Sequence, residues 1–201
     1  MDAASLAAVH DLLGLAAPAS GAAQLTIQTD GPAAAVEAEA IAAVLTAAGG
    51  EVRLAADDAE AQQLWTVRRS MHPAMERLGT TLIEDVSVPR SALPDMFDEI
   101  ARIEREYGLV IPAVAHAGDG NLHPNFIFEG EDVPDHIWAA ADDLFRSALR
   151  LGGTLTGEHG IGVLKRRWLA DELGEDQWDL QRRIKAVFDP AGILNPGKVF
   201  A

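Results

Sequence analysis

The fold is decided by residues 109–128, which read LVIPAVAHAGDGNLHPNFIF. An apolar run over 109–115 leads into Gly-Asp-Gly-Asn at 118–121, and a run of alternating polar and apolar residues follows. Because glycine and asparagine tolerate positive φ angles, this tetrapeptide is typical of a tight turn. The stretch therefore predicts a β-hairpin whose second strand includes residues 126–128.

Helices and strands are predicted on both sides of this hairpin. Hydrophobic periodicity, good helix formers and end signals predict helices at 33–48, 57–68, 91–108, 134–151 and 176–188. Alternation predicts further strands at 22–29, 51–55 and 81–88. This order predicts an α+β, ferredoxin-like fold with a largely antiparallel sheet covered by helices. We assign residues 1–21 to a lead-in helical segment and 22–201 to one domain.

The composition argues against several classes of function. The chain has 201 residues, 16 basic against 31 acidic side chains, a formal net charge of -15 and no cysteine. The negative charge opposes binding to nucleic acid, whose phosphates attract lysine and arginine. Without cysteine, disulfides and thiolate metal sites are excluded. Met1-Asp2 begins no basic signal region, and no apolar run approaches the roughly 18 residues of a membrane span, so we expect a cytoplasmic protein.

The hairpin itself carries two histidines. His116 is predicted at the end of one strand and His123 at the start of the next, so the two imidazoles can face each other. Period-two alternation places Asn125 on the same face as His123. Two neutral imidazoles that converge are good ligands for zinc or a similar divalent ion. From spacing alone, a pair of hydrogen-bonded histidines near a turn remains the other interpretation.

A second cluster lies in the glycine-rich segment GTLTGEHGIG at 153–162. Adjacent side chains of an extended chain point in opposite directions, so Glu158 can complete a His-His-Glu metal site while His159 faces a substrate. A nearby metal would keep such a histidine base neutral. A helix-capping glutamate beside a surface histidine is the alternative. Arg68 shares a helix face with Trp65, and its guanidinium fork matches a carboxylate, although this pair alone is a weak signal.

Taken together, the motifs resemble a known family. The chain contains HAGDGNLHPN at 116–125, GTLTGEHGIGVLKRRWL at 153–169, IKAVFDPAGILNPGK at 184–198, LWTVR at 64–68 and EDVSVP at 84–89. These motifs resemble the C-terminal half of FAD-linked oxidases of the glycolate oxidase D-subunit, D-lactate dehydrogenase and D-2-hydroxyglutarate dehydrogenase type. The resemblance covers most of the chain, from the strand predicted near Leu25 to the end.

The resemblance implies roles for individual residues. It implies that a divalent metal, zinc or manganese, is held beside the flavin by His116, His123 and Glu158. It further implies that His159 is the general base, which takes the hydroxyl proton of a 2-hydroxy acid while the hydride passes to FAD. Substrate contacts are implied for Arg68 and Asn125, and a position near the flavin is implied for Asn195 and Lys198.

The chain also departs from the family pattern. Relatives that oxidise dicarboxylates carry a lysine before the DVS segment, whereas here the stretch is Leu82-Ile83-Glu84-Asp85, so we expect a monocarboxylate such as glycolate or D-lactate. No residues correspond to the family's FAD-binding domain. We therefore expect a partial enzyme that needs a FAD-binding domain or subunit, and the glycolate type implies an iron–sulfur subunit as a further partner. A stand-alone His/His/Glu hydrolase or lyase and a non-catalytic binding module are the alternatives.

Overall fold

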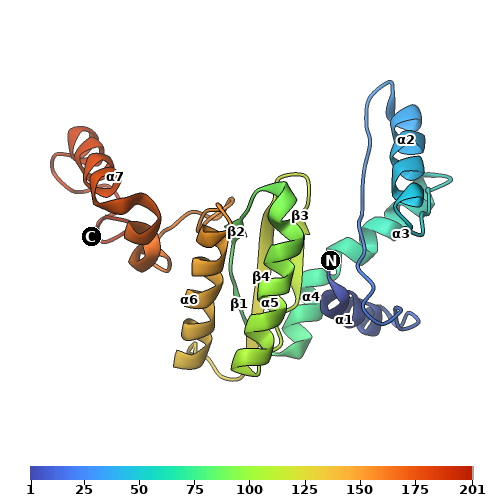
Figure 1. Cartoon of the computed structure of the whole chain (residues 1–201), viewed down its shortest axis with the longest axis horizontal. Helices are drawn as coiled ribbons and strands as arrows, with labels where there is room; N and C mark the ends of the chain where they lie inside the picture. Colours follow the sequence, from blue (N-terminus) through green and yellow to red (C-terminus); the bar gives the residue numbers. More distant parts are fainter. Residues whose placement is uncertain (201) are drawn as a thin grey trace. The chain divides into compact units, whose positions relative to one another are not determined.

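A computed structural model describes residues 1–200 of the chain. It divides into two compact units, one from Met1 to Arg77 and one from Leu78 onward. Figure 1 shows the elements of each unit. No helix among residues 1–200 combines the length and the apolar character that crossing a membrane requires.

The first unit is helical. It contains α1 (Ala3–Leu13), α2 (Ala34–Ala47), α3 (Asp58–Arg69) and most of α4 (Met71–Leu78). The side chains of Asp2 and Asp57 cap α1 and α3 by accepting hydrogen bonds from backbone N–H groups of the first turn. The helix predicted within residues 1–21 is therefore present, and so are the helices predicted at 33–48 and 57–68.

Two strands predicted in this unit are absent. Residues 22–29 and 51–55 form no strand, and Leu25 and Ile27 remain 60% and 50% exposed. Alternation of polar and apolar residues shows that a segment is compatible with a β-sheet. A strand forms only where a neighbouring strand pairs with the backbone groups of that segment. The described residues provide no such neighbour, so the prediction of strands at 22–29 and 51–55 was wrong.

The second unit holds the sheet. Its elements are β1 (Thr80–Ile83), β2 (Val86–Ser87), a short 3-10 turn (Arg90–Ala92), α5 (Leu93–Tyr107), β3 (Ala113–His116), β4 (Asn121–Phe128), α6 (Asp135–Arg150) and α7 (Arg166–Phe188). Among the described strands, β4 is central and pairs antiparallel with all the others. The hairpin predicted at 109–128 is therefore confirmed as β3 and β4. Helix α7 begins well before the predicted residue 176, and Gly174 kinks it.

β1 and β2 are two pieces of one strand, because both keep the same register against β4. The interruption at Glu84-Asp85 faces Pro124. The backbone N–H of Glu84 donates to the carbonyl of Pro124, but proline has no N–H with which to return that bond. The strand predicted over 81–88 is thus present with a local break, and the break carries two acidic side chains.

The architecture confirms the α+β class and the antiparallel sheet. Strand, helix, hairpin and helix follow one another, which is most of the ferredoxin-like β-α-β-β-α-β order. After α6, a single antiparallel bridge between Thr154 and Ser87 occupies the place of the last strand. Helices α5 and α6 pack against each other beside the sheet (Figure 1).

Alternation along β4 separates a core face from a polar face. Leu122 and Phe126 are fully buried in one apolar cluster with Ile100 of α5 and Leu144 of α6. Because successive side chains of a strand point to opposite faces, His123 and Asn125 project from the other face of β4. The candidate site lies on this second face.

Candidate functional site

The hairpin brings the two predicted histidines together. In the β3–β4 register, Val114 faces His123 and His116 faces Asn121, so both histidines emerge on the same face of the sheet. Their ring centroids are 5.3 Å apart. His123 is only 6% exposed, whereas His116 at the strand end is more open. Burial lowers the pKa of His123 although the charges of Asp85 and Glu158 oppose this, which favours the neutral ring that a metal ligand requires.

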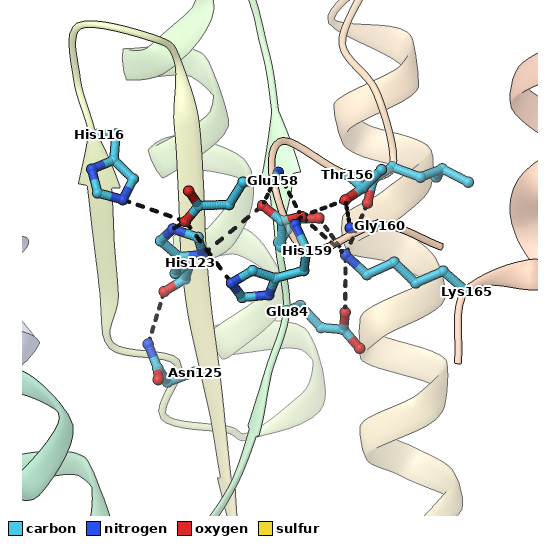
Figure 2. A network of polar contacts seen from close by, with 11 residues as sticks. Glu84, His116, His123, Asn125, Thr156, Glu158, His159, Gly160 and Lys165 are labelled. Carbon is cyan, nitrogen blue, oxygen red and sulfur yellow. Dashed lines mark hydrogen bonds and ion pairs between the residues drawn. The ribbon is translucent and has the colours of Figure 1, made fainter. Parts of the chain in front are cut away.

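Glu158 completes the predicted trio. Its Oε1 atom lies 3.0 Å from Nε2 of His123 and 3.5 Å from Nε2 of His116. Figure 2 shows the three side chains turned toward one another. One ligand atom from each of the three residues lies within 4.8 Å of the others. A tetrahedral zinc-type ion, bound at about 2.0–2.2 Å from each ligand, separates its ligand atoms by about 3.4 Å. The three donors therefore have the chemistry and the spacing to hold a divalent metal.

His159 lies beside the trio rather than away from it. Its ring stacks on His123 with centroids 5.0 Å apart and an interplanar angle of 20°, and its Nε2 is 3.9 Å from Glu158 Oε1. The expectation that Glu158 and His159 point in opposite directions was therefore wrong, because the segment between Gly157 and Gly160 bends instead of running extended. The His159 ring is half exposed, so it can contact a substrate next to the trio.

Asp85 is a component that the sequence reasoning missed. It is fully buried and accepts hydrogen bonds from the hydroxyl of Thr156 (2.5 Å) and the backbone N–H of His159 (2.9 Å). Its burial alone would raise the pKa of the carboxyl, but these hydrogen bonds and the charge of Lys165 lower that pKa to about 2. Asp85 also lies opposite His123 in the strand register. The EDVSVP motif was the available signal, because period-two alternation in the predicted strand 81–88 places Asp85 on a polar face.

A buried ion pair lies next to Asp85. Lys165 Nζ is 3.6 Å from Glu84 Oε2 and donates to the backbone carbonyls of Asp85 (2.5 Å) and Leu155 (3.0 Å). Glu84 Oε1 has no hydrogen-bond partner among the described residues. Burial raises the pKa of Glu84 to about 7 although Lys165 opposes this, and burial also lowers the pKa of Lys165. The pair joins the strand to the loop that carries Glu158 and His159.

Glu84 makes stability depend on pH. Its folded pKa of about 7 lies above the ordinary 4.5, so the folded state keeps a proton that the unfolded state loses, and stability falls as the pH rises between these values. Glu84→Gln cannot ionise. The unaltered chain is therefore expected to lose on the order of 2 kcal/mol of stability between about pH 5 and pH 8 that the Glu84→Gln variant does not lose. The free energy of unfolding of the variant should rise by this amount relative to that of the unaltered chain. Urea titrations with a metal chelator present measure this, and exposed Glu131→Gln is the control. An equal effect of Glu84→Gln at both pH values would contradict the assignment.

Four further residues belong to the predicted site. Arg68 is half-buried on α3 in the first unit. Asn125 is buried on β4, where its Nδ2 donates to the backbone carbonyls of Pro112 and His123, so only its Oδ1 is left for a substrate. Asn195 and Lys198 line a cavity of about 560 Å³ after the end of α7, and none of the clustered histidines borders this cavity. Within the second unit, the structure thus brings together His116, His123, Glu158 and His159, with Asn125 next to His123 on the same face of β4, whereas Asn195 and Lys198 line the separate cavity.

Comparison with known proteins identifies the family. The model of the family described as "FAD linked oxidases, C-terminal domain" matches residues 1–199. The chain belongs to this family.

Among curated proteins, the chain is 39% identical over 207 residues to glycolate oxidase subunit GlcD of Bacillus subtilis, covering 100% of this chain and 44% of that protein. It is 36% identical to glycolate oxidase subunit GlcD of Escherichia coli (98% of this chain, 41% of that protein). It is also 34% identical to mitochondrial D-lactate dehydrogenase [cytochrome] 1 of Saccharomyces cerevisiae (74% of this chain, 26% of that protein). The chain thus spans less than half the length of these relatives.

Proposed function

We propose that this chain is the substrate- and metal-binding part of a flavin-dependent oxidoreductase that converts a 2-hydroxy monocarboxylate into the 2-oxo acid. The observation that carries the proposal is the convergence of His116, His123 and Glu158, with His159 stacked beside them, in a chain of this family. The names of the relatives, glycolate oxidase and D-lactate dehydrogenase, support a small 2-hydroxy acid as the substrate.

Each side chain of the cluster has a separate task. His116, His123 and Glu158 hold the metal, and His159, whose side chain is half exposed, takes the proton of the substrate hydroxyl. Arg68 binds the substrate carboxylate and Asn125 contacts the substrate. A bound zinc or manganese ion would polarise the hydroxyl and carboxylate oxygens of the substrate, and a bound FAD would accept the hydride.

Charge near the site favours a monocarboxylate substrate. Two buried acidic side chains, Glu84 just before the DVS residues and Asp85 as the first of them, stand at this place and offer no cation to a second carboxylate. Lys165 does not fill this role, because its ammonium group is buried against Glu84 and two backbone carbonyls. Glycolate and D-lactate, which have one carboxylate, fit this charge distribution better than a dicarboxylate.

The remaining parts of the enzyme are proposed to come from partners. FAD is bound mainly by a separate domain or subunit, while Asn195 and Lys198, in the cavity after α7, approach it from this chain. An iron–sulfur subunit, as in glycolate-type enzymes, completes the set. Nucleic acid is not expected as a partner, because the net charge is -15.

Joining the chain to the flavin-binding part of the Bacillus subtilis relative tests the proposal. The fusion is expected to reduce an electron-accepting dye with glycolate or D-lactate, and a metal chelator is expected to abolish this. The isolated chain and the isolated flavin-binding part are expected to be inactive. Metal-dependent hydrolase or lyase activity of the isolated chain, together with an inactive fusion that binds FAD, would contradict the proposal.

A further inference from the structure

One buried carboxylate lies next to both halves of the candidate metal site. Asp85 lies in the break between β1 and β2, with no exposed surface. Figure 2 shows a network of polar contacts that links the histidines on β3 and β4 to Thr156, Glu158 and His159 in the loop after α6. Two of the three donors that we assign to the metal, His123 and Glu158, belong to these two separate segments. Their mutual position therefore depends on whatever joins the segments.

The first half is the loop that carries Glu158 and His159. Oδ2 of Asp85 accepts from the Thr156 hydroxyl and from the backbone N–H groups of His159 (2.9 Å) and Glu158 (3.2 Å). The same Thr156 hydroxyl accepts from the backbone N–H of Gly160 at 2.8 Å. The polar backbone groups of this bend are thus tied to one side chain, which fixes where the bend lies on the sheet.

The second half is His123. Its Nε2 faces Glu158, and its Nδ1 is buried without a hydrogen-bond partner among the described residues. The nearest acidic oxygen to that nitrogen is Oδ1 of Asp85, at 4.0 Å. Histidines that bind a metal through one ring nitrogen almost always donate the other N–H to a carboxylate, a carbonyl or water, which fixes the ring orientation. Asp85 Oδ1 is beyond hydrogen-bond distance of Nδ1 here, but it is the carboxylate that lies beside this nitrogen and can take that role.

Asp85 is itself held in place. Lys165 Nζ donates to the backbone carbonyl of Asp85 on the strand and to that of Leu155 in the loop. The backbones of the same two segments also pack closely at Gly153 and Ser87. A Cβ atom on Gly153 would lie only 2.2 Å from the carbonyl oxygen of Ser87, so no larger residue fits there. The carboxylate therefore projects from a rigid support, as a group that orients metal ligands must.

We propose that Asp85 is the positioning residue of the metal centre, which holds Glu158 and His159 through their backbone N–H groups and orients His123 through Nδ1. This inference rests on the proposed function of the site. It is not the assignment of a fourth ligand, although an oxygen of Asp85 lies within reach of nitrogens of His123 and His159. The carboxylate has no exposed surface, and one of its oxygens already accepts three hydrogen bonds.

The test compares Asp85→Asn with Asp142→Asn. Asp142 is a matched control, because its carboxylate accepts hydrogen bonds from Trp168 and Arg146 on the helical side of the same unit. Zn²⁺ affinity, measured by competition with a chromophoric chelator, is expected to fall about 10- to 100-fold for Asp85→Asn and to stay unchanged for Asp142→Asn. In the metal-free protein, amide hydrogen exchange of Glu158 and His159 is expected to become faster only for Asp85→Asn.

Thr156 supplies a second pair of variants in case Asp85→Asn does not fold. Thr156→Ser keeps the hydroxyl that donates to Asp85, and Thr156→Val removes it. Faster exchange at Glu158 and His159 and weaker Zn²⁺ binding are expected for Thr156→Val, with rescue by Thr156→Ser.

Three outcomes would overturn the inference in distinguishable ways. If the Asp85→Asn or Thr156→Val protein binds Zn²⁺ as tightly as the unaltered chain does, the inference about Asp85 is overturned and the proposed function stays intact. Loss of Zn²⁺ binding without faster exchange at Glu158 and His159 would make Asp85 a ligand. Failure of the unaltered chain to bind Zn²⁺ or Mn²⁺ would remove the proposed function and this inference together.

Discussion

His159→Ala, in the chain joined to a flavin-binding domain, is expected to lower turnover of glycolate or D-lactate by about 10²- to 10⁴-fold, the usual contribution of a general base. The His159 side chain is half exposed and stacks on His123 beside the proposed metal ligands, so a substrate can reach it. Its removal leaves the three donors His116, His123 and Glu158 in place. Steady-state dye reduction under saturating substrate measures the effect.

Measuring metal affinity separates loss of proton transfer from loss of the metal in the His159→Ala protein. Zn²⁺ affinity of His159→Ala is expected to stay within a few-fold of the unaltered chain, because the ring stacks on His123 and is not one of the three assigned ligands. His136→Ala serves as the control, since His136 is exposed on α6. Turnover of His159→Ala equal to that of the control would contradict the assignment of His159 as the base.

His123→Ala is expected to weaken Zn²⁺ binding by about a hundredfold or more, since loss of a ligand should cost more than the 10- to 100-fold that loss of an outer-shell partner costs. Of the three donors, His123 is the most buried, and it lies on the central strand β4 with Nε2 at 3.0 Å from Glu158. His116 and Glu158 are more exposed, and without His123 no buried ligand remains to fix the position of the metal. Competition titration with a chromophoric chelator gives the affinity.

The loss must come from the missing imidazole and not from misfolding. Circular dichroism of metal-free His123→Ala is expected to match that of the unaltered chain, because Phe126 and Leu122 hold β4 in the core from its opposite face. His136→Ala is again the matched control and is expected to bind Zn²⁺ normally. Unchanged affinity in a folded His123→Ala protein would remove His123 from the site.

The local parts of the fold could be predicted from the sequence. The hairpin was predictable because Gly118 to Asn121 is turn chemistry between two runs of strand type, and α6 because its periodicity and length agree. Strands at 22–29 and 51–55 were predicted wrongly, since alternation carries no information on whether a partner strand exists. The early start of α7 was missed because Gly174 interrupts the helical pattern.

The site divides in the same way. His116 and His123 could be brought together from the sequence because a short turn fixes their register. Asp85 could not be placed in the site from the sequence, since its position opposite His123 depends on pairing between strands that are distant in the sequence. The Glu84–Lys165 pair also escaped prediction, because charged residues in sequence normally indicate exposed positions. The bend that turns His159 toward His123 depends on hydrogen bonds to Asp85 and was hidden for the same reason.

The metal content of the purified chain tests the central claim most directly. After incubation with zinc or manganese near neutral pH and removal of free ions, elemental analysis is expected to find about one ion per chain, as three converging donors with an open position predict. His123→Ala and Glu158→Ala, analysed in parallel, are expected to retain almost none. Equal and negligible metal in the unaltered chain and in both variants would contradict the account.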